Sequence, residues 1–218
     1  EFMKNYCFKY QPKLKNVKEI RVVKHGVDVD KFNYNLKRGY GKRLGWVGNL
    51  KPVKDPMRIL RLMPQIPDWQ LRFLAVPSVY PKLTHQTEKM VGNQRNIIWI
   101  RKKVPHLKMP AYYQKLDVFA NTSLIESQCV SVLEAMSCGI YSLIRKWPHP
   151  ECHAEEIYPR DLLFDTMVEC KRKIWSWVKL SFNEKKAVSR RMRLFVVKRH
   201  NVKDNVRRMR KMIEGVVK

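Results

Sequence analysis

The stretch that decides the fold is LDVFANTSLIESQCVSVLEAMSCGIYSLI, at Leu116–Ile144. It begins and ends with short runs in which apolar residues do not alternate with polar ones, as is typical of strands buried on both faces of a sheet. Between these runs lie a polar loop and a helix-like stretch at Val130–Ser137. A strand, loop, helix and strand in this order predict two parallel strands joined by a covering helix.

The same alternation of strands and helices continues on both sides of this segment. We predict strands at Arg43–Val47, Gln70–Val76, Asn96–Ile100, Asp117–Ala120, Ile140–Ile144 and Leu162–Phe164. We predict helices near Pro56–Met63, Pro81–Val91, Met109–Lys115 and Val130–Ser137. The fold class is therefore α/β, a Rossmann-like parallel sheet with helices on both faces. An earlier run, Ile20–Lys24, is either an edge strand or a connector.

From Met167 onward the pattern is helical, which predicts a C-terminal tail of helices. One apolar face is marked by Ile174, Trp177, Val178 and Phe182, and a second by Val202, Val206, Met209, Ile213 and Val216. The second stripe lies opposite a basic face formed by Lys203, Arg207, Arg208, Arg210 and Lys211. Such a helix can rest on a membrane surface or bind a partner, but Val, Ile and Met without Trp or Phe make a poor membrane anchor. We therefore expect the stripe to dock on the domain.

The chain has 218 residues, enough for one ordinary domain with a substantial core. Residues 1–2 resemble a cloning remnant, residues 3–19 form a basic N-terminal segment, and the predicted domain covers residues 20–218, with its helical tail at about 167–218. No apolar run approaches the roughly 18 residues that would span a bilayer, and no signal-peptide pattern opens the chain. We expect a cytoplasmic protein that is peripheral to a membrane at most.

Basic residues dominate the composition, because 45 Lys and Arg stand against 19 Asp and Glu, a net charge of +26. A surface of this kind attracts polyanions such as an anionic membrane surface, phosphorylated substrates or nucleic acid. A well-solvated basic surface with no specific partner is an equal alternative. Nucleic acid is the least favoured partner, because no RNP-type, helix-turn-helix or zinc-finger pattern accompanies the charge.

The five cysteines are odd in number and include no CxxC pair. This pattern suits a reducing cytosol better than a disulfide framework. His149, Cys152 and His153 lie close together in the sequence, yet a structural zinc site needs about four ligands with paired spacing. We therefore predict no metal site.

Two loops follow predicted strands at the edge where open parallel sheets bind ligands. The first is GNLKPVKDP, at Gly48–Pro56. Gly48 would let the backbone approach a ligand, Lys54 supplies a cation, and Asp55 and Pro56 suit the N-cap and the first position of a helix. Together these features predict a phosphate cradle at a helix N-terminus. A simple turn with solvent-exposed lysines is the alternative.

The second loop is NTSLIESQC, at Asn121–Cys129, and it leads into the helix that carries Glu134. Backbone N–H groups from about Gln128 to Ser131 would point out of this helix start toward a bound phosphate. Glu134 lies about one turn into the helix and can face the same site, where a carboxylate can take two vicinal ribose hydroxyls. Glu126, on the loop itself, can reach a sugar. The spacing of the two glutamates also occurs by chance, so it counts only in the context of these loops.

Three segments carry a resemblance to a known family. They are HGVDVDKF (His25–Phe32), LGWVGNLKPVKDP (Leu44–Pro56) and the stretch Leu116–Ile144 quoted above. In order and approximate separation they resemble the C-terminal, donor-nucleotide-binding domain of retaining, family-4-type GT-B glycosyltransferases. The resemblance covers nearly the whole chain from about Ile20, and Glu126 and Glu134 match the family's E-x7-E motif.

The resemblance implies roles for the residues that match the family's motifs. Glu134 would hold the donor ribose, Glu126 the transferred sugar and Lys54 the donor diphosphate. The donor site would be completed by Gly48, Asn49 and Ser127 and by the amides of Gln128, Cys129 and Val130.

Two positions depart from the family's pattern. Asn49 stands where the family commonly has an arginine on the diphosphate, and Ser127 stands where a glycine is usual. A replacement cation could come from Lys102, Lys103 or Arg145.

The resulting hypothesis is the donor-binding half of a glycosyltransferase that takes a nucleoside-diphosphate sugar and retains the anomeric configuration. The resemblance implies no metal requirement, and a lysine with helix N-termini can offset diphosphate charge; no cofactor is expected. Transfer to an acceptor of unknown identity would need an acceptor-binding domain, another subunit or a homodimer partner. The alternatives are a nucleotide- or sugar-binding module without transfer activity, and a basic nucleic-acid-binding protein.

Overall fold

A six-stranded sheet runs through the part of the chain that the computed structural model describes, which is residues 23–35, 39–77, 79–148 and 153–214. Its strands are β1 (Arg43–Asn49), β2 (Gln70–Val76), β3 (Ile97–Ile100), β4 (Val118–Asn121), β5 (Tyr141–Arg145) and β6 (Leu163–Phe164). All neighbouring strands pair in parallel, in the order β3-β2-β1-β4-β5-β6. The predicted Rossmann-like α/β class is confirmed.

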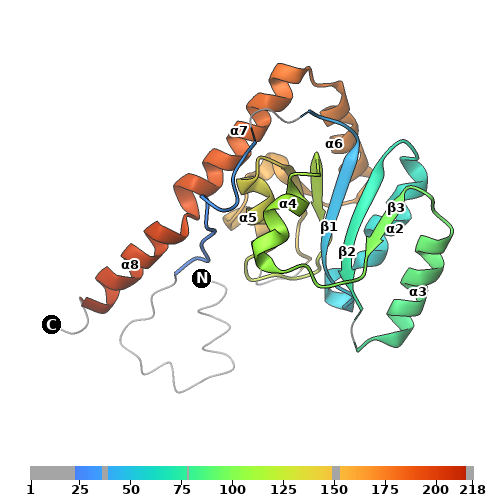
Figure 1. Cartoon of the computed structure of the whole chain (residues 1–218), viewed down its shortest axis with the longest axis horizontal. Helices are drawn as coiled ribbons and strands as arrows, with labels where there is room; N and C mark the ends of the chain where they lie inside the picture. Colours follow the sequence, from blue (N-terminus) through green and yellow to red (C-terminus); the bar gives the residue numbers. More distant parts are fainter. Residues whose placement is uncertain (1–22, 36–38, 78, 149–152, 215–218) are drawn as a thin grey trace.

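Helices surround this sheet (Figure 1). They are α2 (Pro56–Leu62), α3 (Pro81–Gly92), α4 (Met109–Tyr113), α5 (Val130–Ser137), α6 (Met167–Lys179), α7 (Phe182–Arg199) and α8 (Val202–Glu214). Short 3₁₀ turns lie at Pro52–Lys54, Met63–Gln65, His106–Lys108, Ala154–Glu156 and Arg160–Leu162. In Figure 1, α3 lies beside β3, while α7 and α8 run one after the other on the opposite side of the molecule.

Two apolar clusters fill the space between the sheet and the helices, one on each face. Strand β4 shows the alternation, because Phe119 belongs to one cluster and Val118 and Ala120 belong to the other. The first cluster joins the sheet to α4, α5 and α7, and the second joins it to α2 and α6. This burial on both faces explains why the predicted strands lack polar alternation.

Strand β1 is two residues longer than predicted. Its pairing with β2 continues to Gly48 opposite Ala75 and Asn49 opposite Val76, so these two residues end the strand and do not begin the loop. The predicted bounds of Gln70–Val76 and Val130–Ser137 are confirmed. The remaining elements differ from their predicted bounds by one or two residues, at ends where the last hydrogen bonds of an element fray. Of the predicted edge segment at 20–24, residues 20–22 lie outside the described residues, and Val23 and Lys24 form no strand.

The strand order places a topological switch point between β1 and β4. From β1 the chain proceeds to β2 and β3 on one side, whereas β4 leads to β5 and β6 on the other. Open α/β sheets bind ligands outside the carboxyl ends of the strands at such a point. The loops at residues 50–55 and 122–129 leave β1 and β4 there.

The C-terminal helices differ in how much apolar surface they bury. Helix α6 buries Ile174 and Trp177, and α7 buries Met192 and Val196. Helix α8 buries only Asn205 among its described residues. None of the helices within the described ranges is long and apolar enough to cross a membrane.

The expected docking of the last helix is wrong. Three residues that we call the α8 stripe are exposed: Val206 by 45%, Met209 by 46% and Ile213 by 57%. Helix α8 starts after a turn at His200–Asn201 and extends away from the sheet (Figure 1), so these side chains do not reach the core. Val216, also predicted in this stripe, lies outside the described residues.

Candidate functional site

The loop after β1 positions Lys54 through an unusual turn. A 3₁₀ turn at Pro52–Lys54 is followed by Asp55 in the left-handed region, with φ 44° and ψ 55°. Aspartate is one of the few residues besides glycine that visit this region readily. Asp55 is the N-cap residue of α2 and Pro56 its first residue, as predicted. The Asp55 carboxylate makes no capping hydrogen bond and instead accepts from Arg58 at 2.5 Å and Arg145 at 3.0 Å.

Lys54 and Glu126, from the two predicted loops, contact each other directly. Lys54 Nζ donates to Glu126 Oε1 at 2.6 Å, and Ser123 Oγ donates to the same oxygen at 2.8 Å. The Lys54 and Glu126 side chains are 30% and 12% exposed, so the pair is only partly open to solvent. The backbone also joins the loops, because the Leu124 N–H donates to the Val53 carbonyl at 2.8 Å. The two loops therefore form one unit.

Trp46, a buried residue of β1, supports both loops. Its indole Nε1 donates to Thr122 Oγ1 at 2.9 Å, and that hydroxyl lies 2.9 Å from the carbonyl oxygens of Lys54 and Asp55. A Cβ on Gly48 would lie 2.7 Å from the same indole, so packing against Trp46 already requires glycine there. The close approach of a ligand, which the sequence suggested, is not needed to explain it.

Helix α5 begins at the end of the second loop. Cys129 occupies its N-cap position in an extended conformation, and Val130 is its first residue. The first N–H groups of a helix have no acceptor four residues earlier in the helix. The Val132 N–H here donates to the Cys129 carbonyl at 3.2 Å, so the N–H groups of Val130 and Ser131 are the ones suited to an anion. Burial raises the pKa of the Cys129 thiol to about 12, and the charge of Glu126 adds to this effect. The thiol therefore stays protonated and unreactive.

The Gln128 side chain ties this loop to two distant segments. Its carbonyl oxygen accepts from the His25 N–H at 2.9 Å, and its amide nitrogen donates to the His25 carbonyl at 3.1 Å. The same nitrogen lies 3.1 Å from Nδ1 of buried His200, at the turn between α7 and α8. Burial lowers the pKa of His200 to about 4, so its neutral ring accepts this hydrogen bond. The sequence predicted a role for the backbone amide of Gln128 but none for its side chain.

The two residues that depart from the family's pattern are both exposed. They are Ser127, next to Gln128 on the second loop, and Asn49, the last residue of β1.

Glu134 lies on α5 with its side chain 8% exposed, and both of its oxygens have partners. The hydroxyl of Tyr113 donates to Oε2 at 2.9 Å, and His106 Nε2 lies 2.7 Å from Oε1. Burial, and then the charge of Glu134, raise the pKa of Tyr113 well above its ordinary value, so Tyr113 keeps its proton and remains a donor. In the described structure Glu134 thus contacts a different set of residues from the Lys54–Glu126 pair.

Sequence reasoning missed His106 and Tyr113. Both lie between β3 and β4, on the segment that follows the carboxyl end of β3. Ligands of open parallel sheets bind outside the carboxyl ends of the strands, and this applies to the segment after β3 as it does to the loops after β1 and β4. No residue spacing in the segment points to Glu134, so only the three-dimensional contact reveals the set.

The three cations considered as replacements for the family's arginine fall into two groups. The Arg145 side chain is 9% exposed, and it donates to Asp55 and at 3.4 Å to the Thr122 carbonyl, so it supports the loops from within. Lys102 and Lys103 are exposed on the loop that follows β3.

Among the described residues, no group of three or more His, Cys, Asp or Glu side chains could hold a metal ion. His149 and Cys152 of the zinc candidate lie outside those residues, and His153 is exposed. Asp28 and Asp30 are spaced as in metal-binding D-x-D motifs, but both are otherwise occupied. Asp28 Oδ1 accepts from the N–H groups of Asp30 and Lys31, and Asp30 pairs with Lys203 at 2.7 Å.

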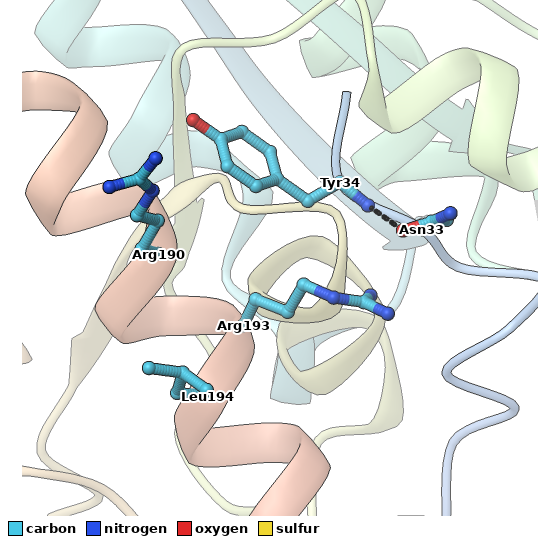
Figure 2. Close-up of a pocket in the computed structure, with 5 residues that line it drawn as sticks. All are labelled: Asn33, Tyr34, Arg190, Arg193 and Leu194. Atoms are coloured by element: carbon cyan, nitrogen blue, oxygen red, sulfur yellow. Dashed lines mark hydrogen bonds between the residues drawn. The ribbon is translucent and has the colours of Figure 1, made fainter. Parts of the chain in front are cut away.

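A cavity of about 310 Å³ lies between residues 33–34 and α7, and it contains none of the predicted donor residues. It is lined by Asn33, Tyr34, Arg190, Arg193 and Leu194. Figure 2 shows Arg193 extending from α7 toward the segment of Asn33. Its guanidinium donates to the carbonyl oxygens of Val29, Phe32 and Ser137, each at 3.1 Å. Arg193 therefore fastens α7 to its neighbours, and the cavity adds no chemistry to the candidate site.

Comparisons with known proteins identify a family and structures of similar fold. Residues 41–164 match the family described as Glycosyl transferases group 1. The C-terminal domain of a glycosyl transferase group 1 family protein from Francisella tularensis has a similar structure, with a TM-score of 0.64 at 18% identity. That match covers 81% of this chain and 100% of that chain. A search of curated proteins finds no match.

Two longer proteins share the fold as well. A glycosyltransferase from Rickettsia africae matches with a TM-score of 0.79 at 13% identity, over 100% of this chain and 62% of that chain. Anabaena HepE, solved in complex with UDP and glucose, matches with a TM-score of 0.74 at 16% identity, over 89% of this chain and 57% of that chain. This chain thus spans 62% and 57% of the lengths of these two proteins. Because the family match covers more than half of the 218 residues, the chain belongs to the glycosyl transferases group 1 family.

Proposed function

We propose that this chain binds a nucleoside-diphosphate sugar at the carboxyl edge of its sheet and serves in transfer of the sugar with retention of the anomeric configuration. The observation that carries the proposal is the contact between Lys54 and Glu126 at the β1–β4 switch point, beside the start of α5. A cation and a helix N-terminus can hold a diphosphate, and a carboxylate can hold a sugar hydroxyl. Membership of the family supports the proposal, as does the UDP and glucose bound to the Anabaena protein of the same fold.

The Lys54–Glu126 pair suggests which contacts the donor would replace when it binds. In the proposed exchange, Lys54 turns from Glu126 to the diphosphate, and the released carboxylate takes hydroxyls of the transferred sugar. Glu134 takes the ribose hydroxyls on the same edge.

We propose that the reaction needs no metal ion. Lys54 and the backbone amides that lead into α5, at Gln128, Cys129 and Val130, would stabilise the charge that develops on the leaving diphosphate. Because Arg145 is held by Asp55, the proposed replacement for the arginine missing at Asn49 is Lys102 or Lys103.

The acceptor side is proposed to lie outside the donor edge. This chain spans 62% and 57% of two proteins of its fold, and the α8 stripe is exposed beyond the sheet. We assign the α8 stripe to contact with an acceptor-binding domain, a subunit or a second copy of the chain. An anionic membrane is the competing occupant. Salt-sensitive retention on vesicles with acidic lipid, lost when the stripe is changed to serine, would favour the membrane.

The test of donor binding is a thermal-shift panel of UDP, GDP, ADP and their sugars. A ligand at 100 times its Kd adds about 2.7 kcal/mol to the free energy of unfolding, so one nucleotide and its sugar should raise the melting temperature clearly. Failure of every nucleotide to do so would contradict the proposal. By itself the chain should release sugar slowly at most, since acceptor orientation and water exclusion need a facing surface. Binding with no release under any condition would favour a binding module.

A further inference from the structure

His106 is an exposed histidine that contacts a buried carboxylate. Its side chain is 64% exposed, whereas that of Glu134 is 8% exposed, and Nε2 lies 2.7 Å from Oε1. An exposed histidine can exchange its hydrogen bonds with water, so its ring keeps one orientation only where neighbouring groups hold it. Two groups of the HGVDVDKF segment do so here.

The first group is Lys31, whose Nζ lies 3.5 Å from His106 Nδ1. An ammonium group can only donate, so this contact suits a ring whose Nδ1 accepts and whose Nε2–H points to Glu134 Oε1. The second group is Phe32, a buried ring whose centroid lies 5.2 Å from that of His106. Lys31 and Phe32 thus both contact the ring of His106 where it meets Glu134.

The two oxygens of Glu134 differ in their surroundings. Oε2 accepts from Tyr113, which is fully buried, so this contact is part of the core. Oε1 accepts from His106, which is mostly exposed and can rotate into water. A ligand that brings its own hydroxyl donors can therefore replace His106 but not Tyr113.

We propose that His106 is a positioning residue that occupies Oε1 of Glu134 as the structure shows and gives way to the ribose hydroxyls of a nucleoside diphosphate. The inference rests on the proposed function, because it takes the ribose to be the ligand of Glu134. Tyr113 orients the Glu134 carboxylate whether or not nucleotide is bound. His106, held by Lys31, supplies a donor to Oε1 of Glu134 until the ribose hydroxyls replace it. The buried carboxylate is then satisfied both with and without nucleotide.

The first test compares His106→Ala with the parent chain, using UDP, GDP and ADP and their 2′,3′-dideoxy forms. Loss of the competing donor should strengthen binding of the preferred ribonucleotide by about 3- to 10-fold, the worth of one neutral hydrogen bond. Binding of the dideoxy form should not change. His85→Ala, which removes an exposed histidine on α3, is the matched control and should change neither. Weaker or unchanged binding of the ribonucleotide by His106→Ala would overturn the inference.

The second test follows the ring nitrogens of His106 by NMR in the parent chain. Saturation with the ribonucleotide should shift the Nε2 resonance, because its hydrogen bond is broken, and saturation with the dideoxy form should leave it in place. An unmoved resonance in both cases would also overturn the inference. If the parent chain binds both forms equally well, the ribose role of Glu134 fails and this inference fails with it. If the parent discriminates but His106→Ala does not bind more tightly, only this inference fails.

Discussion

Helices α5 and α8 differ in how much of their surface the rest of the chain buries. Helix α5 buries every residue from Val132 to Ser137, and the one carboxylate among them, Glu134, has partners on both oxygens. Helix α8 buries only Asn205 among its described residues and leaves the α8 stripe exposed. Figure 1 shows the same contrast, with α5 against the sheet and α8 extending away from it.

The difference separates what this chain can do by itself from what it needs a partner for. The donor edge is internally satisfied, because Lys54, Glu126 and Glu134 each have partners within the chain. The loops of this site are already ordered, so a nucleotide that binds exchanges side-chain contacts there and need not order the backbone first. The α8 stripe gains nothing comparable from the described chain. Donor binding should therefore be insensitive to changes in α8 and sensitive to changes around α5.

The largest expected effect is that of Glu126→Gln. This change removes the carboxylate but keeps the shape, and it leaves Lys54 partly solvated at 30% exposure, so the fold should persist. We expect release of sugar from the preferred nucleotide sugar to fall on the order of 10²–10³-fold, as when one stabilising group is removed from a reacting centre. Affinity for the bare nucleotide should stay nearly constant.

The measurement is sugar release at saturating donor, with nucleotide affinity determined in parallel. Glu156→Gln is the control, because Glu156 is an exposed glutamate on the 3₁₀ turn Ala154–Glu156. A loss of bare-nucleotide affinity in Glu126→Gln would show that Glu126 is a structural or base-contacting residue.

A smaller effect is expected for Glu134→Ala. Loss of a charged hydrogen-bond acceptor should weaken nucleotide binding by about 1.5–3 kcal/mol. The 2′,3′-dideoxy nucleotide lacks the hydroxyls concerned and should bind the variant and the parent almost equally. Calorimetry with both ligands provides the comparison. Equal losses for the two would remove Glu134 from the ribose site.

The melting temperature of unliganded Glu134→Ala separates binding from folding. The change leaves the buried hydroxyl of Tyr113 without its acceptor, so some stability should be lost. The double variant with Tyr113→Phe removes both polar groups together and should recover part of that loss. It should not recover ribonucleotide affinity.

The fold was largely predictable from sequence because its signals are local. Apolar runs near β1, β2 and β4 and the Pro56 and Val130 helix starts all act within a few residues. The partners of the site residues were not predictable in this way. The Lys54–Glu126 contact joins residues 72 apart in the sequence, and the His106–Glu134 contact joins residues 28 apart. No periodicity encodes such pairs.

Two features were predicted only in part. Asp55 is the N-cap residue of α2, as its sequence position indicated, but its left-handed backbone and the nearby Arg58 and Arg145 direct its carboxylate to these arginines and away from the helix amides. The α8 stripe has the period of a docked helix, but periodicity reports only that a face is apolar. It does not report whether the chain itself supplies the surface that covers the face.

The smallest expected effect is that of Val206→Ala, which tests whether the described chain covers the α8 stripe. Val196 on α7 is fully buried and Val206 on α8 is 45% exposed, so Val196→Ala and Val206→Ala make the same chemical change on neighbouring helices. Helix propensity changes equally in both and cancels in the comparison. Val196→Ala should lower the free energy of unfolding by about 1.5–3 kcal/mol, since the packing of a buried side chain is lost. Val206→Ala should change it by less than about 0.5 kcal/mol in either direction. Urea unfolding of the two variants and the parent measures both values, and similar losses in the two would mean that α8 docks on this chain after all.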